Sequence, residues 1–350
     1  MLQTKTKGLF VDFSEYALLL ARTSSYKSPI HIEELAERSL TDNLEETAEF
    51  IREFVQLKSG SFIQSKCSVY PSQRFIRRFT LDTAQKAKNP NYFMDTLNSQ
   101  FRVDPEKNAI TILNAATGAE FDLEKGVDKE LMFVGAPIEE LKSCQKQLLE
   151  RSIYPASLEI GTVSTLGGLM QYSKVKGLNA PTLVLEITAD NSNVFIFRDD
   201  MLDVSRPISF GLNSMYPIIQ QELGLKDESS AKKIFYSNTF DFTEMGPKLL
   251  RKMLKELQAS TGFYEVQTGQ TIGQIFLSLL PKNLQWVGQV LARSLGVDVV
   301  ELDFPAWVKA QGITMADEVD VASLENRWIG LFGLMGDYNT AEKEGNVEKV

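Results

Sequence analysis

Histidine and cysteine are nearly absent from this sequence. Its 350 residues include one histidine, His31, and two cysteines, Cys67 and Cys144, which stand far apart and lack the spacing of metal ligands. Catalysis by histidine and zinc sites built from histidine and cysteine are therefore disfavoured. The two cysteines are most simply interpreted as buried thiols of a protein from a reducing compartment.

Long apolar runs and a positive net charge are also missing. No stretch approaches the roughly 18 consecutive apolar residues that a membrane-spanning helix needs. The N-terminal segment MLQTKTKGLF holds too short an apolar run for a signal peptide. The net charge of −9 argues against general nucleic-acid binding. We therefore expect a cytoplasmic protein.

The signatures of several enzyme classes are absent too. The sequence contains no GxxxxGKS/T loop, no GxGxxG after a strand, no GxSxG elbow and no HExxH pair. We assign no catalytic residue from the sequence, and a protein without enzymatic activity is favoured over an enzyme.

What is present is the composition of a soluble globular protein, with 43% hydrophobic and 24% charged residues. The length suits about two domains, and GLNAP at 177–181 is typical of a linker. We predict a first α/β domain over 1–176 and a second over 177–335. Between about residues 80 and 130, a helical pattern of apolar residues is followed by short strand-like apolar runs, which predicts a small inserted α+β subdomain. The polar residues 336–350 are expected to be disordered.

The two predicted domains begin in the same way. The first opens with an apolar run, then Asp12, Phe13 and Ser14, then a second apolar run. The second opens with an apolar run that ends in Glu186-Ile187-Thr188 and resumes after a polar turn. An acid, an apolar residue and a hydroxyl residue at the tip of each opening hairpin indicate a duplicated domain.

This duplicated pattern resembles the actin-like ATPase superfamily, whose two ribonuclease H-like lobes each begin with a hairpin carrying an acid followed by glycine. Within it the sequence looks most like the PilM family of type IV pilus assembly proteins, and more distantly like FtsA. The resemblance covers nearly the whole chain and is weak at most single positions. It is carried by LEITADNSNVFIFRDDMLDVSRPISFG, by IFLSLLPKNLQWVGQVLARSLGVDVVELD and by WIGLFGLMG.

The resemblance implies two phosphate-binding hairpin tips, in which glycines let backbone N–H groups approach the nucleotide. Ser14 and Thr188 stand where those glycines would be, and Glu15 and Asp190 would direct negative charge at a polyphosphate. One like-charge contact at about 4 Å costs roughly 4 kcal/mol at an effective dielectric near 20. Two such contacts would cancel a micromolar affinity of about 8 kcal/mol. We therefore expect no bound nucleotide cofactor.

Other remnants of such a nucleotide site can be placed by the same resemblance. Asp12 and Glu186 resemble the magnesium-ordering and water-activating acids, and Ser192 closes the second hairpin tip. The third loop, which is glycine-rich in the superfamily, begins at Ser278 and contains no glycine before Pro281. A structural role for the two acids, capping the hairpin tips, is favoured. A slowly hydrolysing switch that binds Mg-ATP stays open as the alternative.

The resemblance also implies a partner. PilM-like proteins hold a short cytoplasmic segment of a membrane-anchored, PilN-like protein beside the inserted subdomain. Arg74, Arg77 and Arg78 in SQRFIRRF form the one local basic cluster and are our candidate partner-binding residues, with a solvated strand face as the alternative. The predicted function is a scaffold of a type IV pilus or type II-like secretion platform that reaches the inner membrane through this partner. A homo-oligomer stays open.

Overall fold

The computed structural model describes residues 7–40, 43–58, 60–89, 91–122, 129–199, 201–237 and 239–345. The chain divides into two compact units. The first lobe comprises Met1–Lys176, Asp303–Leu324 and Trp328–Val350. The second lobe comprises Gly177–Leu302 and Glu325–Arg327. The first crossing between the lobes therefore falls directly before the GLNAP linker.

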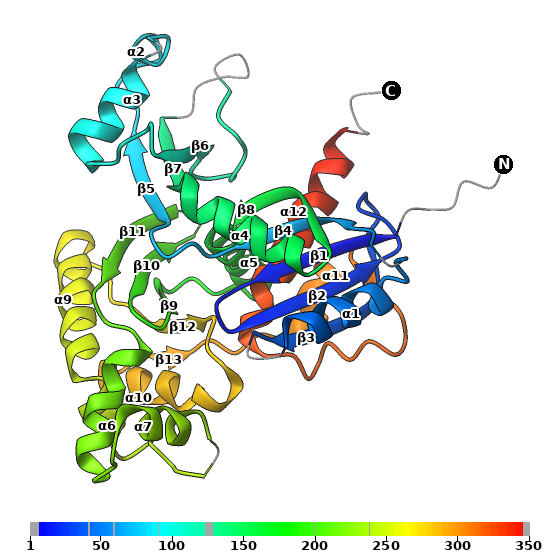
Figure 1. Ribbon diagram of the computed structural model, residues 1–350. Coiled ribbons are helices and arrows are strands. Elements are labelled where there is room, and N and C mark those ends of the chain that lie inside the picture. The colour runs from blue at the N-terminus through cyan, green and yellow to red at the C-terminus, as the bar shows by residue number, and fades with distance from the viewer. Residues whose placement is uncertain are drawn as a thin grey trace. The chain divides into compact units, whose positions relative to one another are not determined.

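The sheet of the first lobe is built on a hairpin of two apolar strands (Figure 1). β1 (Gly8–Phe13) is buried along its whole length and pairs antiparallel with β2 (Ala17–Thr23). The strand order is β14-β3-β2-β1-β4-β8, in which β4 runs parallel to β1 and β8 parallel to β4. The other strands of this sheet are β3 (His31–Ser39), β4 (Ile63–Val69), β8 (Ile153–Ile160) and β14 (Thr314–Met315).

Helices cover both faces of this sheet. On one face, α1 (Leu44–Phe54) and α4 (Ile138–Glu150) share an apolar core with the strands. Asn43 caps helix α1, because its Oδ1 accepts a hydrogen bond of 2.9 Å from the backbone N–H of Glu45. The other face carries α5, α11 and α12, which span Gly161–Lys176, Phe304–Ala310 and Ile329–Gly345.

Helices α5 and α12 pack at very short range because glycines line their contact. A Cβ placed on Gly333 would lie 2.1 Å from the carbonyl oxygen of Ser164, and one on Gly168 would lie 3.2 Å from Ile329 Cγ1 of α12. Only a residue without a side chain allows the first approach. The repeated glycines of WIGLFGLMG therefore have a packing role in the first lobe.

The inserted subdomain of the first lobe forms its own small sheet and core. Its strand order is β5-β7-β6, formed by Phe75–Thr80, Glu130–Pro137 and Asn108–Asn114. Its helical segments are α2 (Ala84–Ala87), α3 (Tyr92–Thr96) and the π-helical turn η1 (Leu97–Phe101). Aromatic side chains dominate the core, among them Phe79 and Phe133. The subdomain is wider than the predicted 80–130, because the strands on either side belong to its sheet.

The second lobe repeats the topology of the first. Its strand order is β11-β10-β9-β12-β13, which matches β3-β2-β1-β4-β8 strand for strand. The strands span Thr182–Ile187 (β9), Ser192–Arg198 (β10), Met201–Ile208 (β11), Gln274–Ser278 (β12) and Asp298–Val299 (β13). The helices and short turns are η2 (Leu212–Met215), α6 (Tyr216–Glu222), α7 (Glu228–Tyr236), α8 (Gly246–Leu249), α9 (Arg251–Thr268), η3 (Lys282–Leu284) and α10 (Trp286–Leu295). The predicted duplication is confirmed.

The C-terminal domain boundary was predicted wrongly. The predicted second domain ran to 335, whereas residues 303–324 and the chain from Trp328 onward belong to the first lobe. The turn η4 (Asn326–Trp328) spans the last crossing between lobes. Within the predicted disordered tail, helix α12 continues to Gly345, and residues 346–350 lie outside the described part of the chain. A chain that returns to an earlier domain cannot be recognised from a linker signal alone.

Candidate functional site

Asp12 lies near the end of β1, and its carboxylate is buried, with 2% of the residue exposed. The parallel pairing of β1 with β4 sets Asp12 beside Ser68. Ser68 Oγ donates a hydrogen bond of 3.0 Å to Asp12 Oδ1, and Tyr70 Oη donates one of 3.2 Å to Oδ2. Both carboxylate oxygens therefore accept hydrogen bonds from hydroxyl groups of the same lobe.

Two helices close over this carboxylate. Tyr70 Oη lies 3.3 Å from Thr165 Oγ1 of α5. A Cβ placed on Gly330 of α12 would lie 2.5 Å from Asp12 Oδ2 and 2.5 Å from Tyr70 Oη. The backbone of α12 thus touches the acid. Sequence reasoning missed Tyr70, Thr165 and Gly330, because they are brought to Asp12 by long-range packing and share no motif with it.

Ser14, at the first predicted glycine position, uses its hydroxyl to close the hairpin tip. Its Oγ accepts hydrogen bonds from the backbone N–H groups of Tyr16 at 3.3 Å and Ala17 at 3.2 Å. Its own N–H donates to the carbonyl of Ala17 at 3.1 Å. Tip N–H groups are therefore directed at the turn itself. Glu15, at the apex, is exposed.

Thr188 does the same in the second lobe. Its backbone N–H donates to the carbonyl of Asn191 at 2.9 Å, and its Oγ1 accepts from the N–H of Asn191 at 3.3 Å. Asp190, at the exposed apex, accepts a hydrogen bond of 2.8 Å from Asn213 Nδ2. Ser192 donates to the carbonyl of Phe210 at 2.7 Å and is fully buried. The second tip has the same inward hydrogen bonding as the first.

Glu186 and Ser278 stand side by side in the second lobe as Asp12 and Ser68 do in the first. Parallel pairing of β9 with β12 sets them in register, and both residues are buried. Ser278 Oγ makes no hydrogen bond to any described residue. Each lobe thus has an acid–serine pair across its first parallel strand pair, a relation that the sequence analysis did not predict.

The third loop keeps the backbone of a glycine turn without the glycine. Leu279 has a φ of +66°, in the left-handed region that costs an ordinary L-residue about 1–2 kcal/mol. Its side chain and that of Leu280 are buried, with 5% and 1% exposed. The loop therefore buries apolar side chains, and Pro281 after it has no N–H to donate.

The three candidate arginines differ sharply. Arg74 is buried, with 6% exposed, and its Nε donates a hydrogen bond of 2.7 Å to Thr162 Oγ1. Its Nη1 donates to the carbonyl of Pro71 at 3.0 Å. Arg74 therefore links the segment after β4 to α5 and is not accessible to a partner. Burial lowers the pKa of Arg77, whose Nη1 donates to the carbonyl of Ile76. Arg78 forms an ion pair of 2.9 Å with Glu130.

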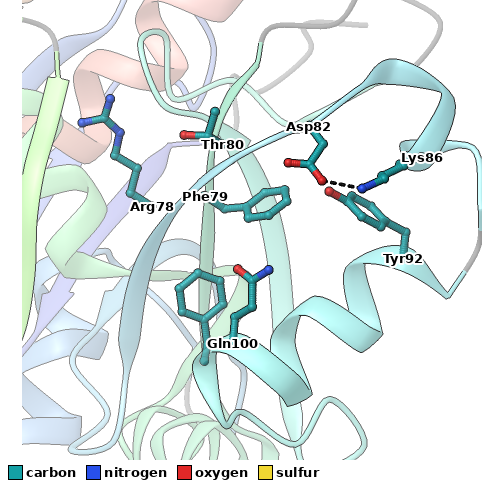
Figure 2. A pocket seen from close by; sticks show the side chains of 8 residues that line it. Arg78, Phe79, Thr80, Asp82, Lys86, Tyr92 and Gln100 are labelled. Carbon is teal, nitrogen blue, oxygen red and sulfur yellow. Dashed lines mark hydrogen bonds and ion pairs between the residues drawn. The ribbon is translucent and has the colours of Figure 1, made fainter.

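A pocket opens in the inserted subdomain beside Arg78 (Figure 2). Its volume is about 530 Å³. The strand β5 and the segments α2, α3 and η1 supply its lining, which consists of Arg78, Phe79, Thr80, Asp82, Lys86, Tyr92, Gln100 and Phe101. Figure 2 shows the rings of Phe79 and Tyr92 within it and the Asp82–Lys86 ion pair at one side. Sequence reasoning found Arg78 and missed the aromatic lining, because such residues also form ordinary cores.

Among the described residues, no group of three or more histidine, cysteine or acidic side chains could hold a metal ion. No helix of the described chain is both long and apolar enough to cross a membrane.

Comparison with known proteins identifies the fold. A scan against protein-family models finds no match, and no curated protein matches. Among solved structures, a PilM–PilN type IV pilus biogenesis complex contains a chain with a TM-score of 0.67 and 15% identity, over 96% of this chain and 99% of that one. The present chain has the actin-like fold and is PilM-like in structure.

Two further structures are more distant. The cytoplasmic domain of EpsL, an inner membrane component of the type II secretion system of Vibrio cholerae, gives a TM-score of 0.41 and 8% identity, over 96% of this chain and 95% of that one. A protein with an actin-like ATPase fold from Bacteroides thetaiotaomicron gives 0.44 and 11%, over 89% and 96%. Neither is similar enough to guide inference at single residues.

Proposed function

We propose that this protein is a non-catalytic, actin-like scaffold of a type IV pilus or type II-like secretion platform, located in the cytoplasm at the inner membrane. It binds a cytoplasmic segment of a membrane-anchored, PilN-like partner. The observation that carries the proposal is the pocket beside Arg78, in a subdomain with its own core. The similarity to a chain of the PilM–PilN complex over 96% of this chain supports the choice of partner class.

The proposal treats the protein as a pseudo-ATPase, because magnesium and nucleotide fit its loops poorly. Hydroxyl groups already engage both oxygens of Asp12. The N–H groups of Ala17 and Asn191 bond to tip hydroxyls of their own hairpins. Glu15 and Asp190 stand exposed at the two apices, where they would repel phosphates.

A second candidate is an ATP-binding, slowly hydrolysing switch in the same assembly. It is favoured by one observation, the retention of an acid–serine pair in register in both lobes. A residual magnesium site would be the simplest reason to keep both pairs. The nucleotide titration argued in the Discussion separates the two candidates.

The partner proposal is tested by membrane association in cells that express the full-length chain. Arg77→Ala/Arg78→Ala should lower the fraction that sediments with membranes severalfold, because the change breaks the Arg78–Glu130 ion pair and leaves an uncompensated carboxylate beside the pocket. The matched control, Arg251→Ala/Lys255→Ala, removes two exposed positive charges from α9 in the second lobe. The proposed site is refuted if the first double variant sediments like the wild type while its melting temperature stays the same.

A further inference from the structure

The pocket opens on the edge of a sheet. It is lined by three consecutive residues of β5, Arg78 to Thr80, and β5 is an outer strand of the order β5-β7-β6. Successive side chains of a strand point to opposite faces, and a pocket at the strand's outer edge accounts for three lining residues in a row. An extended peptide beside Thr80 is the occupant that matches such an edge.

The charges around the pocket are already compensated. Lys86 Nζ lies 2.5 Å from Asp82 Oδ2, and Arg78 Nε lies 2.9 Å from Glu130 Oε2. In Figure 2 the guanidinium of Arg78 points away from the rings of Phe79 and Tyr92. A charged ligand side chain would meet groups that already have a counter-ion, and would gain little Coulomb energy at these solvent-accessible pairs. The pocket therefore favours an uncharged one.

The remaining lining suits an apolar side chain held on a peptide backbone. Phe79 and Tyr92 lie with ring centres 6.0 Å apart at an interplanar angle of 60°, so a third ring or an aliphatic group can pack against them. Gln100 supplies an amide that can both donate to and accept from a peptide group. The lining combines three aromatic rings, from Phe79, Tyr92 and Phe101, with polar side chains, and its volume of about 530 Å³ lies within the range of ligand pockets.

We propose that this pocket binds one bulky, uncharged side chain, aromatic or aliphatic, from an extended partner segment that lies along the outer edge of β5. The inference rests on the proposed function in one respect, that the segment belongs to the membrane-anchored partner. In this proposal Phe79, Tyr92 and Gln100 determine the specificity of the pocket. Arg78 neutralises the charge of Glu130 at its border.

Three matched probes test the side-chain class without the partner: acetyl-Gly-Phe-Gly-amide and its counterparts with arginine or glutamate in the middle. Each is titrated into the 15N-labelled full-length chain, and amide chemical shifts give the dissociation constants. The phenylalanine peptide should bind roughly tenfold more tightly than either charged peptide, because its ring leaves water. Equal or tighter binding of a charged peptide overturns the proposal.

Plugging the pocket tests the location. Gln100 is exposed, so Gln100→Trp should fill the mouth without disturbing a core and should weaken the phenylalanine peptide at least about tenfold. Asn98→Trp, equally exposed on the same helical turn and outside the lining, should change its binding less than about twofold. Gln100→Tyr repeats the plug if the tryptophan variant does not fold. Undiminished binding in a folded plug variant places the site elsewhere.

The two proposals fail separately. Membrane association that depends on Arg77 and Arg78, together with no preference among the tripeptides, would overturn only the side-chain inference. Preference for the phenylalanine peptide, together with unchanged membrane association of the arginine double variant, would leave a peptide pocket and refute its proposed role in binding the membrane-anchored partner.

Discussion

Tyr70 donates its hydroxyl hydrogen to the carboxylate of Asp12 across 3.2 Å, beneath the backbone of α12. The carboxylate of Asp12 is thus part of a hydrogen-bonded cluster that connects β1 with β4, the residue after it and α5. Buried carboxylates are tolerated when hydroxyl or N–H donors replace the water they lose. This arrangement makes the acid a stability determinant.

Replacing Tyr70 with phenylalanine should therefore destabilise the first lobe. The variant keeps the ring and removes one donor to a buried carboxylate, which should lower the free energy of unfolding by about 1.5–3 kcal/mol. Urea denaturation followed by circular dichroism measures the change. Tyr154→Phe is the matched control, because Tyr154 is 46% exposed, and its stability should stay within about 0.5 kcal/mol of wild type. Equal stability of both variants would show that the Tyr70 hydrogen bond has no net value.

The prediction that the protein binds no nucleotide can be tested by thermal denaturation. We expect millimolar Mg-ATP to leave the melting temperature where magnesium chloride alone leaves it, because the tip N–H groups bond internally and Glu15 and Asp190 repel phosphates. A ligand at 100 times its dissociation constant would stabilise the fold by about 2.7 kcal/mol, which is readily detected. A saturable rise in melting temperature with Mg-ATP would favour the switch over the scaffold.

Much of the fold follows from local patterns in the sequence. The similar hairpins at Asp12 and Glu186 predicted two lobes, and the strand order of the second lobe matches that of the first. The C-terminal helix was misassigned because the apolar run WIGLFGLMG could pack on either lobe. Its docking on α5 depends on close glycine contacts such as that of Gly333 with Ser164, and nothing local specifies them.

The properties of the candidate site could be predicted only where they depend on the chemistry of a single residue. Ser14 and Thr188 were expected to obstruct a phosphate, and the structure adds that their hydroxyls bind the tip backbone. Arg74 and Arg78 look alike in sequence, yet Arg74 is buried against Thr162 and Arg78 borders a pocket. Burial of an arginine depends on distant segments, which a single sequence does not reveal.

The left-handed backbone at Leu279 predicts that the usual order of stability of alanine and glycine variants is reversed there. Alanine normally exceeds glycine in stability by about 0.5–1 kcal/mol within regular structure. At a φ of +66° an alanine Cβ is strained and a glycine is not. Leu279→Gly should therefore be at least as stable as Leu279→Ala, although both lose a buried side chain worth about 2–5 kcal/mol.

The neighbouring leucine supplies the control for this order. Leu280 is buried to a similar extent and has no positive φ, so Leu280→Ala should be the more stable of its own pair. Denaturant midpoints of the four variants decide the matter. If alanine is favoured at both positions, the backbone at Leu279 is not strained in solution.

A second polar cluster in the first lobe predicts a pH dependence. Tyr338 of α12 donates a hydrogen bond to Glu159 Oε1 and lies 2.8 Å from Ser157 Oγ, and Lys66 Nζ stands 4.2 Å from its ring centre. Burial raises the pKa of Asp337 to about 7, and the charge of Glu159 adds to the rise. Burial also raises the pKa of Glu159, against the opposing effects of Tyr338 and Lys66.

These raised values fix the sign of the effect. A carboxyl whose pKa is higher in the folded chain than in the unfolded chain holds its proton more tightly when folded. Its stabilising contribution is complete below about pH 4 and is lost as the pH rises through about 7. The free energy of unfolding should therefore decline over this range on account of Asp337. Protein atoms surround the Asp337 carboxyl, yet the residue as a whole is exposed, so water screens the effect and we expect only about 1 kcal/mol.

Asp337→Asn should flatten this decline, since the amide keeps the shape of the carboxylic acid and does not ionise. The variant should gain on the wild type as the pH rises from about 5 to about 8, by roughly 1 kcal/mol at the upper end. Glu318→Gln, which removes an exposed acid outside the cluster, should follow the wild-type curve. Urea midpoints across that range measure the difference. Parallel curves for the wild type and Asp337→Asn would mean that Asp337 ionises alike in the folded and unfolded chain, and that Tyr338 and Glu159 hold α12 independently of its charge.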